Sequence, residues 1–165
     1  MNKKALDLGC GSNPKNPFNV QEVYGVDARK DLGAKIFKAD LAVDPIPFED
    51  NFFDGVCAFD FIEHIPRLIY SPSRRYSFVE LMNEIYRVLK PDGLFFSYTP
   101  AFPSAAAFKD LTHVNIITEE TFPVYFDNLS RVASMYGFNG YFQIRDQKWN
   151  ENETHLMTLM QKVRP

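Results

Sequence analysis

The stretch ALDLGCGSNP, residues 5–14, is the most informative part of this chain for predicting its fold. Its apolar residues carry one acid, Asp7, and end at two glycines, Gly9 and Gly11, which are separated by a single residue. Glycine adopts positive φ angles without strain and lets another group come close to the backbone. In an open α/β sheet, ligands bind beyond the carboxyl ends of the parallel strands. The stretch therefore predicts a buried parallel strand that leads into a ligand-binding turn.

A second acid, Asp27, ends the largely apolar run of residues 23–27. We expect this run to form the neighbouring strand, with its carboxylate beside the glycine turn. A carboxylate in that place can accept hydrogen bonds from both hydroxyls of a ribose, and each charge-assisted bond contributes about 1.5–3 kcal/mol. The two strand ends together predict a ribose-bearing cofactor.

The segment after the glycines indicates which cofactor this is. A dinucleotide site requires a third glycine and a regular helix whose N-terminus binds the pyrophosphate. Here the third glycine is absent, and Pro14 and Pro17 interrupt the segment in which that helix would run. S-adenosylmethionine carries a ribose and an adenine but no phosphate. The sequence therefore favours S-adenosylmethionine over a nicotinamide dinucleotide.

Four stretches carry a resemblance to a known family: LDLGCGSNP at 6–14, VYGVD at 23–27, KADLAVDPIPFEDNFFDGV at 38–56 and EIYRVLKPDGLFFSYTP at 84–100. The chain resembles the class I S-adenosylmethionine-dependent methyltransferases, in particular the compact kind whose first helix is reduced to a proline-containing loop. The resemblance implies an α/β fold with a Rossmann-like, doubly wound, seven-stranded and mostly parallel sheet that ends in a C-terminal antiparallel hairpin. The length of 165 residues is typical of one domain, which we expect to span residues 1–165.

The resemblance also implies which residues bind the cofactor: Asp7, Gly9, Cys10, Gly11, Asp27, Asp40, Leu41 and Phe59. In this family the acid at the place of Asp40 accepts a hydrogen bond from the adenine amine, and the residue at the place of Leu41 packs on the adenine ring. A structural role is the alternative for Asp40, whose carboxylate could cap a helix or a turn.

The residues expected nearest to the transferred methyl group follow the strands predicted at 53–59 and 93–99. An imidazole with a pKa near 6.5 suits the removal of a proton from an acceptor, and such a base contributes about 10²–10⁴-fold to the rate. We expect His113 in this role first, His64 second and Asp60 third. An acceptor that is already an anion would need none of them.

The sequence assigns no definite catalytic role to three further residues or leaves their role open. Glu63 reads as a capping or structural acid, and His64 fits a packed position as well as a substrate-facing one. His155 is expected in the terminal hairpin, away from the strand ends.

Composition excludes several classes of partner. The formal net charge is −3, and no Lys/Arg run exceeds residues 74–75, so we expect no nucleic-acid partner. No apolar run approaches the ~20 residues that cross a bilayer, and no secretory segment is apparent, so we expect a cytoplasmic protein without a membrane contact. Cys10 and Cys57 are expected as buried, reduced thiols, and two cysteines do not make a zinc site. We therefore expect no metal.

The remaining elements follow from periodicity and turn residues. Apolar residues at helical spacing predict a helix from residues 71–73 to 89. Strands are expected at 34–39 and 93–99, and a hairpin at 141–148 and 154–162. A helix is expected over 118–136, with a break near 127–128 left open.

The sequence therefore predicts methyl transfer from S-adenosylmethionine to an oxygen or nitrogen of a small-molecule or sugar acceptor. The alternative is a non-catalytic protein of the same fold that acts as a scaffold or partner subunit. The sequence shows no helix before the glycine turn, where family members carry one to cover the sheet. We expect a homodimer or another partner to cover that face.

Overall fold

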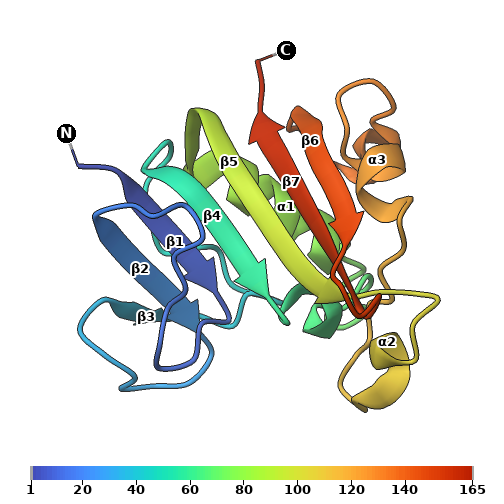
Figure 1. Ribbon diagram of the computed structural model, residues 1–165, viewed down its shortest axis with the longest axis horizontal. Helices are drawn as coiled ribbons and strands as arrows, with labels where there is room; N and C mark the ends of the chain where they lie inside the picture. Colours follow the sequence, from blue (N-terminus) through green and yellow to red (C-terminus); the bar gives the residue numbers. More distant parts are fainter. Residues whose placement is uncertain (1, 165) are drawn as a thin grey trace.

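The computed structural model describes residues 2–164, which contain one seven-stranded sheet (Figure 1). In sheet order the strands are β3 (Ile36–Lys38), β2 (Glu22–Asp27), β1 (Lys4–Leu8), β4 (Phe53–Phe59), β5 (Leu89–Pro100), β7 (His155–Lys162) and β6 (Phe142–Trp149). The strands β1 to β5 lie parallel to one another, and β7 runs antiparallel to both of its neighbours, β5 and β6. The expected Rossmann-like fold with its C-terminal hairpin is thus confirmed.

One face of the sheet packs on helix α1 (Ser77–Val88), which Figure 1 shows behind the strands. Leu6, Val56 and Phe95 are register neighbours on β1, β4 and β5, and all three are fully buried. They belong to the same core cluster as Met82 of α1. Because burial of one such side chain stabilises by about 1.5–3 kcal/mol, this shared core fixes α1 against the centre of the sheet.

The opposite face of the sheet, nearer the viewer in Figure 1, is covered by a loop over its first strands. Residues 9–21 run between β1 and β2 and form no helix within the described chain, as Pro14 and Pro17 predict. Farther along this face the half-buried ring of Phe59 packs against Phe96 and Tyr98, with centroids 5.4 and 5.7 Å away. The reduced first helix is therefore a feature of the structure as well as of the sequence.

The helix expected from residues 71–73 begins later, at Ser77. Ile69 and Arg75 exchange both of their backbone hydrogen bonds, at 2.9 and 2.8 Å, and so close a turn that contains Pro72. The predicted start of this helix was wrong because a proline such as Pro72 is as common in a β-turn as in the first turn of a helix.

The helix expected over 118–136 is interrupted where the sequence left a break open. It consists of α3 (Thr121–Tyr125) and the 3₁₀ turn η2 (Val132–Tyr136). Between them the carboxylate of Asp127 accepts the N–H of Ile144, in β6, at 2.9 Å. This contact to the sheet competes with helix continuation and ends α3 after little more than one turn.

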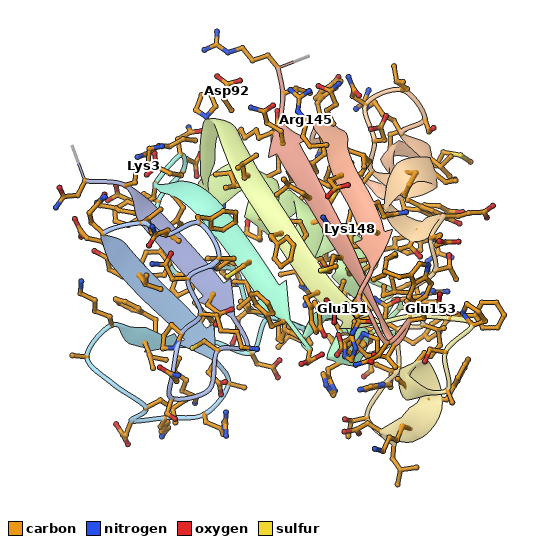
Figure 2. All side chains as sticks on the ribbon, in the orientation of Figure 1. Lys3, Asp92, Arg145, Lys148, Glu151 and Glu153 are labelled. Carbon is orange, nitrogen blue, oxygen red and sulfur yellow. The ribbon has the colours of Figure 1, made fainter. Side chains whose placement is uncertain are left out.

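Short helical pieces gather at the carboxyl ends of β4 and β5, namely η1 (Ile62–His64) and α2 (Ala106–Lys109). Figure 2 shows Glu151 and Glu153, in the turn between β6 and β7, at this same end, and Lys3 and Asp92 at the opposite one. Within residues 2–164, no helix combines the length and the apolar character needed to cross a membrane.

Gly9→Ala is expected to lower the free energy of unfolding by about 2–5 kcal/mol, the sum of a backbone and a packing cost. Gly9 has φ +66°, which disfavours an L side chain, and an added Cβ would overlap the ring of Phe61. Gly137→Ala is the matched control, because Gly137 has φ +92° but nothing within 4 Å of an added Cβ. Denaturant unfolding should show the larger loss for Gly9→Ala; equal losses would contradict the packing cost.

Candidate active site

The ends of three strands converge at the turn after β1. Gly9 and Gly11 have φ +66° and +59°, so both glycines adopt the left-handed conformation that the sequence predicts. The N–H of Gly11 donates to Oδ2 of Asp27 at 2.9 Å and thereby ties the turn to the end of β2. Phe61, just beyond β4, packs directly on Gly9. The glycine turn, Asp27 and the loop after β4 thus form one site.

Asp27 is 8 % exposed, and both of its oxygens accept hydrogen bonds. Nε of Arg29 donates to Oδ1 at 2.9 Å and Nη2 to Oδ2 at 3.2 Å. These bonds from the guanidinium lower the pKa of Asp27 to about 2. A ribose also offers two adjacent donors, and the Arg29 side chain is 68 % exposed, so water can replace its contacts. Two adjacent hydroxyl donors could therefore take the place of the Arg29 guanidinium on this carboxylate.

Asp7 contributes to this site indirectly. The side chain is 2 % exposed; Oδ2 accepts the N–H of Lys15 at 2.8 Å and Oδ1 the thiol of Cys57 at 3.4 Å. Burial raises the pKa of Asp7 above its ordinary value. Asp7 therefore has a structural role, in which it holds the loop of residues 9–21 over β1, and its expected contact with the cofactor stays a prediction.

Cys10 and Phe59 border the same site. The Cys10 thiol donates to the carbonyl of Gly11 at 3.2 Å, and burial raises its pKa to about 11, so the thiol is neutral. Both cysteines are free, as expected, but only Cys57 is buried, whereas Cys10 is half-buried. The ring of Phe59 lies 4.3 Å from Nζ of Lys15, on the side of the loop that covers β1.

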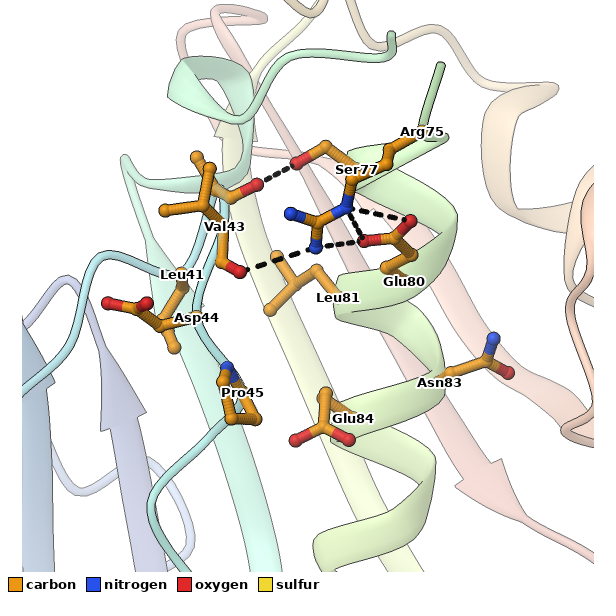
Figure 3. Close-up of a pocket in the computed structure, with 11 residues that line it drawn as sticks. Leu41, Val43, Asp44, Pro45, Arg75, Ser77, Glu80, Leu81, Asn83 and Glu84 are labelled. Carbon is orange, nitrogen blue, oxygen red and sulfur yellow. Dashed lines mark hydrogen bonds and ion pairs between the residues drawn. The ribbon is translucent and has the colours of Figure 1, made fainter. Parts of the chain in front are cut away.

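Asp40 and Leu41, expected at the adenine, differ from each other in exposure. Asp40 is exposed, and its Oδ1 accepts the N–H of Ala42 at 3.1 Å, which is the turn-capping role named above as the alternative. Leu41 is 6 % exposed and faces α1, as Figure 3 shows. Leu41 therefore has little surface to offer an adenine ring, whereas the Asp40 carboxylate is accessible.

All three histidines of the chain line one hollow of ≈ 560 Å³ at the carboxyl ends of β4 and β5, which we call the histidine hollow. Its titratable lining consists of Asp60, Glu63, His64, Lys109, Asp110, His113 and His155. Asp60 directly precedes Phe61, the residue that packs on Gly9, so the histidine hollow begins beside the glycine turn. The structure thus brings together the three residues expected to be catalytic, His113, His64 and Asp60.

His155 also lies here, and the expectation that it is away from the strand ends was wrong. It pairs with Pro100, the last residue of β5, because β7 is antiparallel and begins where β5 ends. Its Nε2 lies 3.0 Å from Oδ1 of Asp60, and its ring stacks on Tyr98 with centroids 4.5 Å apart. Only the sheet pairing reveals this position.

Glu63 is the functional candidate that sequence reasoning undervalued. The residue is 1 % exposed, and its Oε2 accepts the hydroxyl of Thr99 at 2.8 Å. Its backbone carbonyl accepts the N–H groups of Val114 and Asn115, both at 2.9 Å, and this brings His113 next to His64. Burial raises the pKa of Glu63 above its ordinary value. The Glu63–His64 pair was visible in the sequence, but its burial was not.

A second hollow, of ≈ 300 Å³, lies between residues 41–45 and α1 (Figure 3). Its main charged groups are already paired: Arg75 binds Glu80 and the carbonyl of Val43. Ser77 donates to the carbonyl of Ala42. These contacts join the segment to the helix, so we assign this hollow a structural role.

Comparison with known proteins adds a family match over the first part of the chain. A family model described as "Methyltransferase domain" matches residues 6–97. A curated relative, 24-methylenesterol C-methyltransferase 2 of Arabidopsis thaliana, is 35 % identical over 72 residues, which make up 44 % of this chain and 17 % of that protein. The chain therefore spans less than a fifth of this relative.

Solved structures share the architecture at low sequence identity. The YcgJ protein from Bacillus subtilis has a TM-score of 0.63 at 15 % identity, with 99 % of this chain and 93 % of that chain covered. The [4+2]-cyclase SpnF has a TM-score of 0.68 at 15 % identity, with 99 % and 75 % covered. A SAM-dependent methyltransferase from Archaeoglobus fulgidus has a TM-score of 0.61 at 19 % identity, with 97 % and 86 % covered. At these identities the likeness shows the fold alone.

Proposed function

This chain belongs to the methyltransferase-domain family, and on that premise we propose that it is an S-adenosylmethionine-dependent methyltransferase that methylates an oxygen or nitrogen of a small-molecule or sugar acceptor. The position of the histidine hollow carries this conclusion. The hollow is lined by every histidine of the chain and by Asp60, which directly precedes Phe61, the residue that packs on Gly9. Its ≈ 560 Å³ falls within the ~300–1,000 Å³ typical of small-molecule sites.

The cofactor would lie across the ends of β1 and β2. Asp27 would bind the ribose hydroxyls in place of the Arg29 guanidinium, and Gly9 and Gly11 would let the cofactor approach the backbone. Cys10 and Phe59 would border the cofactor, and the Asp40 carboxylate would accept a hydrogen bond from the adenine amine. The bound cofactor supplies a methyl group on a sulfonium, and sulfur keeps the electron pair of the S–C bond when a lone pair of the acceptor forms the new bond to carbon.

The chain's own contribution is alignment and proton removal. Holding two reactants in line contributes about 7–11 kcal/mol to lowering a barrier. A neutral hydroxyl must also lose its proton, and His113 or His64 is placed to accept it, with Asp60 at the edge of the histidine hollow as a third candidate. The two imidazole rings lie 4.9 Å apart, so one acceptor atom can reach either of them.

A non-catalytic scaffold is the competing function, and the fold alone does not exclude it, because one fold serves many functions. The neighbour SpnF, named as a cyclase, illustrates this point. Gly9, Gly11 and the Asp27 carboxylate, whose exposed Arg29 partner can be displaced, favour a working cofactor site.

Calorimetry with S-adenosylmethionine and with S-adenosylhomocysteine, its demethylated product, tests the proposed function. We expect both to bind, because they share the ribose and adenine that Asp27 and Asp40 recognise. NAD⁺ is the control and should not bind, since the chain lacks the third glycine and the helix N-terminus that a pyrophosphate requires. Binding of neither adenosyl compound would favour the scaffold.

A further inference from the structure

One oxygen of Glu63 is buried without a partner. Its Oε2 accepts the hydroxyl of Thr99, but among residues 2–164 no group donates to Oε1, although this atom lies in a side chain that is 1 % exposed. A buried carboxylate oxygen without a hydrogen bond costs free energy unless a proton or a cation compensates it. Glu63 lines the histidine hollow, so a cation in the hollow could reach this oxygen.

Both neighbouring histidines have hydrogen bonds at Nδ1, and these leave Nε2 free for a metal ion. Nδ1 of His113 lies 3.1 Å from the carbonyl of Ala107, which can only accept, so Nδ1 carries the proton. Thr112 donates its hydroxyl hydrogen to Asp110 at 2.7 Å and must therefore accept from Nδ1 of His64 at 2.9 Å. In the neutral form each ring then has its free lone pair on Nε2. Such second contacts fix the tautomer and orientation of metal-binding histidines.

We propose that Glu63, His64 and His113 form a site for a divalent transition-metal ion of the zinc type. One potential ligand atom from each residue lies within 4.8 Å of the other two. In a tetrahedral zinc site with bonds of about 2.1 Å, ligand atoms are about 3.4 Å apart, so modest side-chain rotations would bring them to one ion. Two imidazoles and one carboxylate are an established zinc ligand set that leaves a coordination position open.

The charges around the histidine hollow favour a cation. The carboxylates of Asp60, Glu63 and Asp110 line it, against one ammonium, that of Lys109. The expectation of no metal was argued from the two cysteines, whereas this site uses imidazole and carboxylate ligands. The three ligands come from two segments that the backbone bonds at Glu63 hold together.

The ion would deepen the proposed function, on which this part of the inference rests. An acceptor oxygen in the open position would bind the ion, and its pKa would fall as that of zinc-bound water does, to about 7. Asp60 would then take the released proton. An imidazole that binds the ion cannot also remove the proton of the acceptor, because its Nε2 lone pair is then bound to the ion.

Metal binding is measured directly on the full chain after chelator treatment. We expect Co²⁺ to give the visible absorption bands of a site with nitrogen and oxygen ligands, and Zn²⁺ to displace it with one ion bound per chain. Glu63→Gln and His113→Gln should each weaken Zn²⁺ binding by about 100-fold or more, beyond the loss typical of second contacts. His155→Gln is the matched control and should bind normally, since His155 lines the hollow but is not a ligand.

Circular dichroism checks that each variant folds. If His113→Gln does not fold, His113→Asn is measured in its place. Absence of Zn²⁺ and Co²⁺ binding to the wild type, or equal binding by wild type and both ligand variants, would overturn the metal site. S-adenosylmethionine calorimetry on the same metal-free protein separates the two proposals. Cofactor binding without metal binding removes only the metal site, and metal binding without cofactor binding removes only the proposed function.

Discussion

Replacing His113 by glutamine is expected to lower the turnover number by about 10²–10⁴-fold while the affinity for S-adenosylmethionine stays nearly unchanged. Glutamine keeps the polarity and much of the volume but has no nitrogen lone pair with which to accept a proton. The same loss is expected whether the imidazole accepts the proton itself or holds an ion that activates the acceptor. We replace His113 first, because His64 lies between the buried Ile62 and Ile65, so that a substitution there also affects packing.

The measurement is the release of S-adenosylhomocysteine, first with wild type to find an acceptor among small hydroxyl and amine compounds. The same assay is then run on His113→Gln and His64→Gln, together with calorimetry of the cofactor. Full turnover in both variants would rule out proton removal by either histidine and would indicate an acceptor that is already an anion.

Asp27→Ala is expected to weaken binding of S-adenosylmethionine by about 2–4 kcal/mol, from the loss of two charge-assisted bonds. This corresponds to about a 30- to 1,000-fold rise in Kd. Since burial leaves only 8 % of Asp27 exposed and Gly11 donates to it, Asp27→Asn is the milder variant that keeps an acceptor for Gly11.

Arg29→Ala is the informative control for this prediction. It removes the two side-chain donors of Arg29 from the Asp27 carboxylate, so we expect binding as tight as wild type or tighter. Calorimetry on all three variants gives the comparison. An unchanged Kd for Asp27→Ala would show that Asp27 does not bind the ribose.

Much of the sheet could be predicted because its signals are local. The apolar runs at 5–8, 23–27 and 53–59 form β1, β2 and β4, and the glycines after β1 adopt positive φ. A strand buried on both faces needs apolar residues throughout, and a tight turn needs glycine. These requirements act within a few residues and are therefore visible in a single sequence.

The helical segments were predicted less well because distant contacts decide them. Ile69 and Arg75 pair across Pro72 and delay the start of α1, and the bond from Ile144 to Asp127 ends α3. Local propensity is a weak prior that such tertiary contacts override.

The neighbouring strands at 5–8 and 23–27 and the type of cofactor could be predicted from local signals, among them Gly9, Gly11 and Asp27. Three placements depend instead on distant contacts: Asp7 faces the loop above it, Leu41 faces α1, and His155 joins the other two histidines. The reason is physical. Side-chain direction and burial depend on which strand or loop lies opposite, and the pairing of β7 with β5 joins residues that are far apart in the chain.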